Sequence, residues 1–292
     1  MTGAGAFVDA RGASLPETIR RSTAYLERHG VESARATVEV LLMSFLGADR
    51  AGLYARTAGL DARTAKLFGR ALCQRCQGVP VQHLTGRQQF FDLVLDVRPG
   101  VFVPRPETET LVEVALEAIR ATSAPTVVDV GTGTGAVALA IARFRPDARV
   151  IATDIAPSAV TLTSRNAVRL GLQIDILLGD LLGPVPPDLR GHLDLIVSNP
   201  PYVALHELED LPAEVKREPY EALVGGTGAH RRLAAAAAVW LAPGGWLVSE
   251  IGETQRGEVE ALFGRTLVDV EVLPDLAGRD RVVRGRRADG AG

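Results

Sequence analysis

From residue 126 onward the sequence alternates between short apolar stretches and longer segments whose apolar residues recur with helical spacing. This alternation predicts a doubly wound parallel sheet, an α/β fold with helices on both faces. The expected strands are 126–130, 149–153, 174–178, 193–198, 246–251, 267–273 and 281–284, and the helices between them include 136–144, 157–170, 228–241 and 254–262. Only Pro274–Asp280 separates the last two strands, which is too short for a crossover helix, so these strands are expected to pair antiparallel.

One expected strand, Leu193–Ser198, ends in the segment Asn199-Pro200-Pro201-Tyr202. Consecutive prolines stop a central strand, and the carboxyl edge of an open parallel sheet is where ligands bind. The side-chain oxygen of Asn199 is an acceptor, and the prolines leave only carbonyl acceptors on the backbone. With the ring of Tyr202 beside them, these groups suit a planar NH2 group held by both hydrogens. The alternative is a strand-ending turn without chemistry.

A second motif follows the first strand of the alternation, where Asp129 leads into Gly131-Thr132-Gly133-Thr134-Gly135 and a helix. Glycines remove side chains where the backbone must approach a ligand closely. Asp154 ends the next strand, 23 residues after Gly131, and is placed to accept both ribose hydroxyls of a nucleoside. The sequence therefore predicts a nucleoside cofactor at this turn.

The identity of the nucleoside is less sharply defined, because Gly131-x-Gly133-x-x-Ala136 also fits a dinucleotide. Two features favour a sulfonium cofactor over NAD. Asp129 would repel a pyrophosphate but attract a cation, and the sequence after the glycine turn contains no pattern typical of a hydride-transfer site. A buried structural role for Asp129 is the alternative. Gly179-Asp180-Leu181, after the third expected strand, is either the edge that meets an adenine or a bare turn.

The first part of the chain differs in pattern and in charge. Helical spacing extends over 14–78, where no catalytic constellation is found. Residues 1–90 carry 12 Lys/Arg and 7 Asp/Glu, a net charge of +5, whereas the remainder carries 20 and 28, a net charge of −8. This contrast suggests two bodies with different partners, although +5 is far below the charge of a nucleic-acid-binding arm. We expect 1–78 to be a helical substrate-docking domain.

Between the two bodies, alternating residues at 90–97 and 101–103 flank Arg98-Pro99-Gly100 and predict a β-hairpin, within a linker at 79–105. Pro104 and Pro106 hold Arg105 extended, and Glu107 lies at the start of a helix expected over 108–120. Helix capping is an alternative explanation for Glu107. The catalytic domain is expected at 106–287, followed by a disordered tail at 288–292.

Composition excludes several other classes of protein. The chain is 47% hydrophobic and 23% charged, as a globular protein is. The first fifteen residues lack a signal-peptide core, and the longest apolar run, Leu233–Ala242, is too short to span a bilayer. Cys73 and Cys76 offer no disulfide framework and too few ligands for zinc, so we expect two structural thiols, no metal and a cytoplasmic location.

With these segments in this order, residues 15–285 resemble the protein-(glutamine) N-methyltransferases that modify peptide chain release factors, the HemK/PrmC family. The motifs that carry the resemblance are Leu84–Gly86, Pro99–Glu109, Asp129–Gly135, Asp154, Gly179–Asp180, Val197–Tyr202, Glu218–Pro219, Gly225–Gly226, Glu250–Gly252 and Ala277–Val283. Asn-Pro-Pro-Tyr is shared with amino-group methyltransferases of DNA, whereas the Pro-Arg-Pro segment and the helical first part select this family. A Rossmann-like sheet of seven strands with one antiparallel is also typical of class I methyltransferases.

The resemblance implies methyl transfer from S-adenosylmethionine to the side-chain amide nitrogen of glutamine in the Gly-Gly-Gln loop of release factors. No strong base lies near Asn199 in the sequence, so catalysis is expected to come mainly from positioning. The expected catalytic residues are Asn199, Pro200 and Tyr202, and substrate is expected to meet these residues together with Pro201, Arg105 and Glu107. The expected cofactor-binding residues are Asp129, Gly131, Thr132, Gly133, Thr134, Gly135, Asp154, Asp180, Leu181 and Asn199.

The expected partners are release factors, with no direct nucleic-acid contact, no membrane and the chain acting as a monomer. Three alternatives stay open: a glutamine methyltransferase of a ribosomal protein, an adenine amino-group methyltransferase of nucleic acid, and a binding scaffold without activity. The second would need a basic face, which the charge of −8 after residue 90 does not favour.

Overall fold

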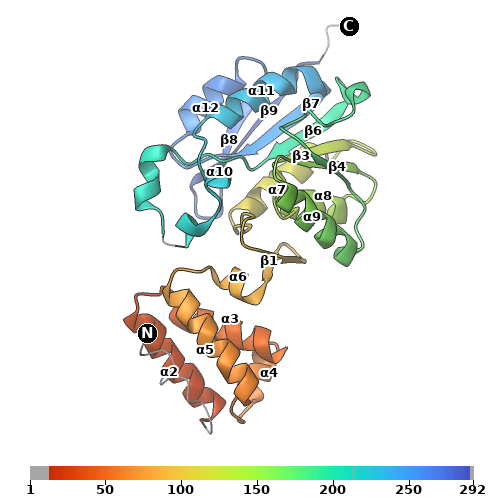
Figure 1. The fold of residues 1–292 in the computed structure, drawn as a ribbon. Helices are drawn as coiled ribbons and strands as arrows, with labels where there is room; N and C mark the ends of the chain where they lie inside the picture. Colours follow the sequence, from red (N-terminus) through yellow and green to blue (C-terminus); the bar gives the residue numbers. More distant parts are fainter. Residues whose placement is uncertain (1–12, 213, 290–292) are drawn as a thin grey trace. The chain divides into compact units, whose positions relative to one another are not determined.

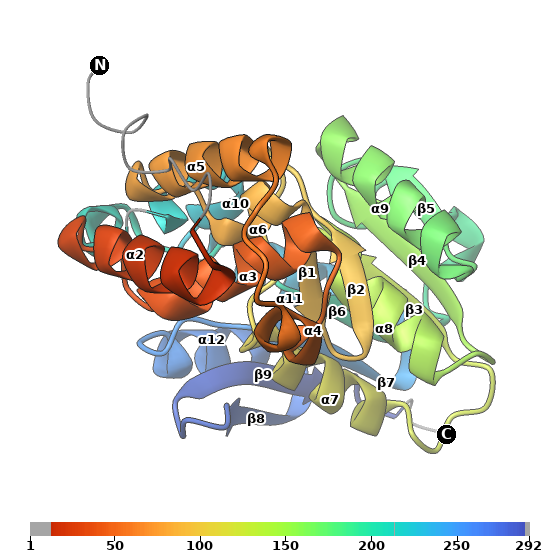
Figure 2. The ribbon, with the colours of Figure 1, turned by 90° about the horizontal axis from the view of Figure 1, so that it is seen from below.

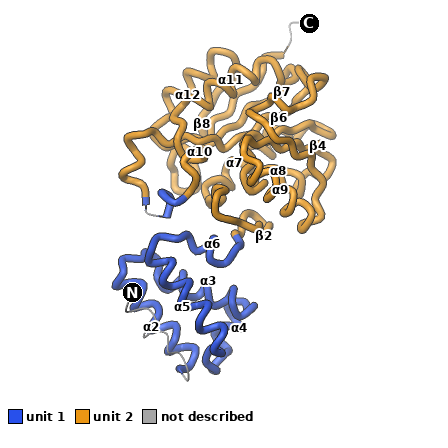
Figure 3. The backbone as a smooth tube through the Cα atoms, viewed as in Figure 1, with its two compact units in different colours: residues 1–87, 212–217 blue, residues 88–211, 218–292 orange. Residues whose placement is uncertain are grey.

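The computed structural model describes residues 13–212 and 214–289. The chain forms two compact units, shown in Figure 3: Met1–Arg87 with Pro212–Arg217, and Gln88–Leu211 with Glu218–Gly292. The first unit thus runs beyond residue 78 and takes in a short segment from the second half of the chain. Of the tail expected at 288–292, residues 290–292 lie outside the described residues.

The first unit is helical (Figure 1). Its helices are α2 (Leu15–Arg28), α3 (Ala34–Leu46), α4 (Arg50–Ala55), α5 (Ala62–Cys76) and α6 (Val81–Thr85). Their apolar faces form one core that includes Leu26, Leu41 and Phe68. Cys73 and Cys76 are free thiols on α5. The inserted segment, which holds the short 3-10 helix η3 (Val215–Arg217), joins this unit through an ion pair between Glu214 and Arg75 at 2.7 Å.

The expected hairpin is present but displaced toward the N-terminus. Its strands are β1 (Arg87–Phe90) and β2 (Leu93–Asp96), so the chain turns at Phe91 and Asp92, and no strand forms at 101–103. Phe90 and Leu93 are both buried in the core of the second unit. In one continuous strand these two side chains would point to opposite faces, whereas a two-residue turn buries both. The linker expected from residue 79 also contains a helix that was not expected, α6 at Val81–Thr85.

The second unit contains a seven-stranded sheet in the order β5-β4-β3-β6-β7-β9-β8. Its strands are β3 (Thr126–Val130), β4 (Arg149–Asp154), β5 (Asp175–Leu178), β6 (Leu193–Ser198), β7 (Leu241–Glu250), β8 (Val268–Pro274) and β9 (Asp280–Arg286). The first five run parallel, and β9 is antiparallel to both β7 and β8. The expected antiparallel pairing of the last two strands is therefore confirmed.

Helices cover both faces of this sheet, as Figures 1 and 2 show. They are α7 (Thr108–Ala118), α8 (Ala136–Phe144) and α9 (Pro157–Leu170) on one face, and α11 (Gly228–Trp240) and α12 (Arg256–Phe263) on the other, with the short elements η1 (Pro187–Leu189), η2 (Leu205–Asp210) and α10 (Tyr220–Leu223) between strands. Successive residues of one strand serve different cores: Val127 packs in the cluster of α7 and α8, and Val128 packs in that of α11 and α12. This alternation is the period of two that a strand buried on both faces imposes.

Candidate active site

Strand register brings four residues into one row at the carboxyl edge of the sheet. Val130 of β3 pairs with Thr153 of β4 and with Ser198 of β6, and Ser198 pairs with Ser249 of β7. The residues that follow these four positions are Gly131, Asp154, Asn199 and Glu250. The first three were expected at a site from the sequence, whereas no role was predicted for Glu250.

The glycine-rich turn after β3 is held by hydrogen bonds to the next strand. The Gly131 and Thr132 amides donate to the Thr153 carbonyl at 2.9 and 3.0 Å, and the Gly133 amide donates to Oδ2 of Asp154 at 2.9 Å. Gly131 has a φ of 74°, and no heavy atom lies within 4 Å of where its Cβ would be. The turn therefore presents open backbone beside Asp154, as close approach of a ligand requires.

Asp129 lies under this turn and is only 1% exposed. Its Oδ2 accepts from the Thr132 hydroxyl at 2.6 Å and from the Ala138 amide of α8 at 3.1 Å. Burial raises the pKa of Asp129 to about 7, against the opposing effect of these two hydrogen bonds. Asp129 therefore fixes the turn onto α8, which is the local structural role considered as the alternative.

Asp154 is half-buried, and the Ala156 amide donates to its Oδ1 at 2.8 Å. Each carboxylate oxygen has a second lone pair, so Asp154 is still able to accept from two hydroxyls. Its neighbour Ile155 is 69% exposed at the same edge, and sequence reasoning did not single it out. An exposed apolar side chain beside a ribose acceptor suits the flat face of a nucleobase.

Asp180 and Leu181 follow β5, beyond Asp154. The Asp180 carboxylate pairs with Arg232, and both side chains are more than half exposed. The Leu181 carbonyl accepts from the Thr153 hydroxyl at 2.8 Å, while its side chain packs against the core on the α11 face. The two residues thus have local partners, and they lie at the carboxyl edge of the sheet where the cofactor is expected.

The Asn199 side chain has a defined orientation. Its Nδ2 donates to the Thr108 hydroxyl oxygen at 3.2 Å, at the start of α7. This leaves Oδ1 as the acceptor that Asn199 presents at the edge of the sheet. The preceding residue anchors the strand end, because the Ser198 hydroxyl donates to the Val130 carbonyl at 2.8 Å.

Tyr202 is fixed at both ends. Its hydroxyl donates to Oε1 of Glu250 at 3.1 Å, and its carbonyl accepts from Nε2 of Gln255 at 2.7 Å. Burial and the nearby charge of Glu250 raise the pKa of the Tyr202 hydroxyl, so it stays protonated and remains a donor at neutral pH. The ring is thereby held in one place beside Pro200 and Pro201.

Arg105 and Glu107 were also expected at the substrate. The Arg105 guanidinium pairs with the fully buried Glu218 carboxylate at 3.2 Å and lies 5.3 Å from the centre of the Phe102 ring. Glu107 is exposed, and its charge contributes to raising the pKa of Tyr202 and Glu250. Among the described residues, no hydrogen bond is seen between either side chain and Asn199–Tyr202.

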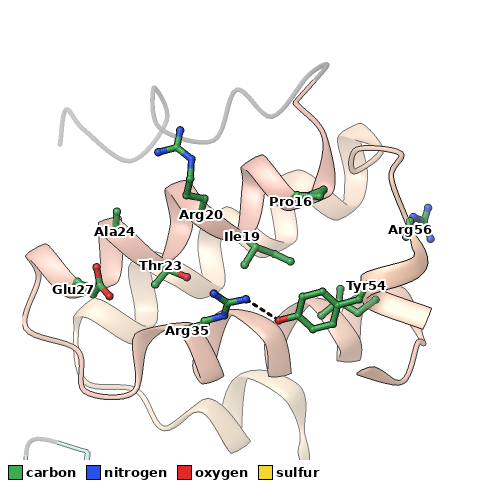
Figure 4. A pocket seen from close by; sticks show the side chains of 10 residues that line it. Pro16, Ile19, Arg20, Thr23, Ala24, Glu27, Arg35, Tyr54 and Arg56 are labelled. Atoms are coloured by element: carbon green, nitrogen blue, oxygen red, sulfur yellow. Dashed lines mark hydrogen bonds between the residues drawn. The ribbon is translucent and has the colours of Figure 1, made fainter. Parts of the chain in front are cut away.

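The first unit contains a cavity of ≈ 450 Å³ (Figure 4). Arg35 and Tyr54 meet there, with Nη2 of Arg35 donating to the Tyr54 hydroxyl at 3.0 Å, and the Thr23 hydroxyl is buried there without a hydrogen-bond partner. Its lining is completed by Pro16, Ile19, Arg20, Ala24, Glu27, Leu53 and Arg56. The lining thus combines three arginines and one glutamate with apolar side chains and two hydroxyl groups.

Two further findings concern the described residues alone. In 13–212 and 214–289, no group of three or more His, Cys, Asp and Glu side chains is arranged to hold a metal ion. Within the same ranges, no helix has both the length and the apolar character needed to cross a membrane.

The sheet order, the glycine turn beside Asp154 and the Asn199 segment together define a class I methyltransferase that uses S-adenosylmethionine. Solved structures with this fold include the catalytic domain of hMettl16 in complex with the MAT2A 3′UTR hairpin 1, with 13% identity over 91% of each chain and a TM-score of 0.57. Another is the T. thermophilus 16S rRNA N2 G1207 methyltransferase, with 21% identity over 69% of this chain and 49% of that chain and a TM-score of 0.52. At such identities, these structures show the fold alone.

The sequence narrows the class to one family. The PrmC N-terminal domain matches residues 17–86, and the methyltransferase small domain matches 93–218. The release factor glutamine methyltransferase of Moorella thermoacetica is 43% identical over 92% of this chain and 95% of its own length. The release factor glutamine methyltransferase of Geobacter sulfurreducens is 41% identical over 90% of this chain and 93% of its own length. That of Deinococcus radiodurans is 39% identical over 94% of this chain and 99% of its own length. The chain belongs to the release factor glutamine methyltransferase family.

Proposed function

We propose that this protein transfers the methyl group of S-adenosylmethionine to the side-chain amide nitrogen of the glutamine in the Gly-Gly-Gln motif of peptide chain release factors. The observation that carries the proposal is the orientation of Asn199. Because its Nδ2 is used by Thr108, Oδ1 is the atom left to accept from an NH2 group. Family membership supports the choice of glutamine over other amino groups.

The residues at the edge of the sheet fit the cofactor. The Asp154 carboxylate is half-buried, anchored by two amides and able to accept from both ribose hydroxyls, while the open backbone at Gly131 leaves room beside it. When bound, S-adenosylmethionine supplies an electrophilic methyl group on a positively charged sulfur. The exposed side chain of Ile155 is the apolar surface available to the adenine.

An amide nitrogen is a weak nucleophile, because its lone pair is delocalised into its carbonyl, and the residues of the site must compensate for this. Oδ1 of Asn199 and the Pro200 carbonyl accept the two amide hydrogens and so fix the direction of the nitrogen. Both acceptors also stabilise the positive charge that develops there as the nitrogen–methyl bond forms and the sulfur–methyl bond breaks, after which the nitrogen releases one hydrogen as a proton to solvent. The Tyr202 ring packs against the planar amide and excludes water from it.

The first unit is proposed to dock the body of the release factor, with the enzyme working as a monomer and without contact to nucleic acid. This assignment is supported by the positive balance of residues 1–90 and by the absence of a catalytic constellation from the described part of this unit. A second contact besides the Gly-Gly-Gln loop would restrict methylation to glutamines in that protein context.

The test is incubation of the protein with S-adenosylmethionine and purified release factor, followed by mass spectrometry of the peptides. We expect one added methyl group on the glutamine of Gly-Gly-Gln, and none with the Asn199→Ala variant. Incubation with ribosomal proteins and with DNA or RNA in parallel provides the comparison. Methylation of one of those substrates, with an unmodified release factor, would overturn the proposal.

A further inference from the structure

Glu250 is a buried carboxyl group directly behind the Asn199 segment. It ends β7, is 2% exposed, and follows Ser249, the register partner of Ser198. Its Oε1 accepts from the Tyr202 hydroxyl at 3.1 Å, whereas Oε2 is buried and has no hydrogen-bond partner among the described residues. A buried carboxyl placed so close to the candidate catalytic residues needs a reason, because burial without full pairing is costly.

Several groups surround this carboxyl. The Thr108 hydroxyl, at the start of α7, favours the charged form of Glu250, and the positive charge of Arg281 of β9 favours the same form. Glu107 opposes that form, and His230 of α11 contacts the Glu250 backbone carbonyl through Nε2 at 2.8 Å. Burial is the largest influence and raises the pKa of Glu250 to about 7.

The hydrogen bonds around Thr108 constrain one another. A threonine hydroxyl has one proton to donate and two lone pairs, and an ionised carboxylate only accepts. Asn199 Nδ2 already donates to the Thr108 oxygen, so the Thr108 proton points elsewhere, and the nearby acceptor that lacks a partner is Oε2 of Glu250. Asn199 then donates to Thr108, and both Thr108 and Tyr202 donate to the Glu250 carboxylate.

We propose that Glu250 is a positioning residue that sets the orientation of the Asn199 amide through Thr108 and holds the Tyr202 ring directly. If Thr108 were free to donate to Asn199, the amide would turn its Oδ1 toward Thr108. Its Nδ2 would then face the substrate, and two donors would meet. By taking the Thr108 proton, the carboxylate keeps Oδ1 available for the NH2 group. The inference rests on the proposed function for the identity of that group.

Glu250→Gln is the decisive variant because it keeps the shape of the side chain. A glutamine carries an NH2 donor in place of one carboxylate oxygen, so it cannot offer separate acceptor atoms to Thr108 and to Tyr202. We expect kcat to fall roughly 10-fold to 100-fold, as when a hydrogen bond to a charged group is lost. The dissociation constant for S-adenosylmethionine should stay within about twofold. Glu258→Gln is the matched control, since Glu258 also accepts from a threonine hydroxyl, that of Thr227, but on the exposed surface.

Double-mutant cycles separate positioning from general stability. Thr108→Val removes the hydroxyl through which Glu250 acts on Asn199. The loss of kcat in the double variant with Glu250→Gln should therefore be far from the sum of the two single losses. Tyr202→Phe should cost less in the Glu250→Gln background than in the wild type. In that background, removal of the Tyr202 hydroxyl leaves the glutamine oxygen free to accept from Thr108. Additive effects in both cycles would overturn the inference.

A readout independent of activity is the side-chain NH2 signal of Asn199 in the ¹H–¹⁵N NMR spectrum, assigned with Asn199→Ala. We expect one protected amide proton in the wild type, and loss of that protection in Glu250→Gln. An unchanged Asn199 signal would overturn the inference even if the wild type methylates release factor. A wild type without glutamine methylation would refute the proposed function, and the NMR comparison would still decide the role of Glu250.

Discussion

A Cβ atom at Gly225 would lie 2.3 Å from the carbonyl oxygen of Pro201. Real Cβ atoms do not come so near an oxygen, so only glycine fits at this position. The approach is held by the Gly225 amide, which donates to the Val203 carbonyl at 3.2 Å, and by a parallel bridge between Val203 and Val224. The segment after α10 therefore supports the backbone of the Asn199–Tyr202 motif from one side.

Gly225→Ala is accordingly expected to displace the Pro201 carbonyl and with it the acceptors at Asn199 and Pro200. Backbone cannot move aside as a flexible side chain does, so we expect a stability loss of about 1–3 kcal/mol. Denaturant unfolding and kcat measured together will show whether activity falls further than stability. Gly228→Ala is the control, since no heavy atom lies within 4 Å of a Cβ there. Equal behaviour of the two variants would contradict the close approach.

Asp154→Ala should weaken the binding of S-adenosylmethionine by about 1–3 kcal/mol, the usual cost when a charged hydrogen-bond partner is removed. The same change also frees the Gly133 amide that anchors the glycine turn. Isothermal calorimetry measures the effect, with the exposed Asp188→Ala as the control. Unchanged affinity in Asp154→Ala would remove Asp154 from the cofactor site.

Asn199→Ala should reduce turnover at least about 100-fold, because a preorganised acceptor for the developing charge is lost. Asn199→Asp is the sharper variant, since it keeps an acceptor oxygen toward the substrate but replaces the NH2 group that donates to Thr108 with a second oxygen. A negative charge there stabilises the ground state as well as the transition state, which does not raise the rate. We expect its kcat to lie above that of the alanine variant and well below wild type. An aspartate variant as fast as wild type would argue against a role for the Asn199–Thr108 bond.

Asp129 makes stability depend on pH. Its folded-state pKa of about 7 lies above the ordinary value of 3.8, so the folded chain binds more protons than the unfolded chain between these limits. The free energy of unfolding should therefore fall as pH rises from about 4 to about 7, by roughly 4 kcal/mol at most from this group. Asp129→Asn should flatten that slope, leaving the part due to Glu250. Unfolding curves at several pH values provide the measurement, and an unchanged slope would refute the assignment.

The docking role of the first unit predicts a difference between two substrates. A shortened chain beginning at Gln88 keeps all seven strands of the sheet and both cores that cover it. It should bind S-adenosylmethionine as the full chain does, yet lose at least about tenfold in kcat/KM on intact release factor. Activity on a short Gly-Gly-Gln peptide should change little. Full activity on the intact protein would show that the first unit does not dock it.

Much of the fold is determined by local sequence patterns. The bounds of β3, β6, α8 and α9 agree with expectation, because each element buries apolar residues with its own period and is bounded by glycine or proline. The glycine turn and the Asn199 segment could be singled out for the same reason, since each combines a strand end with glycine or proline at the carboxyl edge of the sheet. The hairpin lies nearer the N-terminus than expected, because burying both Phe90 and Leu93 requires the turn to fall between them.

Only tertiary structure decided which side chains meet. Glu250 lies 51 positions after Asn199 in the sequence, and although Glu250–Gly252 is one of the motifs shared with the family, the motif does not say which side chain Glu250 meets. The register of β6 with β7 places it beside the motif, and the start of α7 adds Thr108. Likewise, folding gives Arg105 the buried Glu218 as a partner, which no local pattern indicated. Residue types and element periods are local properties, whereas hydrogen-bond partners depend on which strands pair and in what register, and those are fixed only when the whole sheet forms.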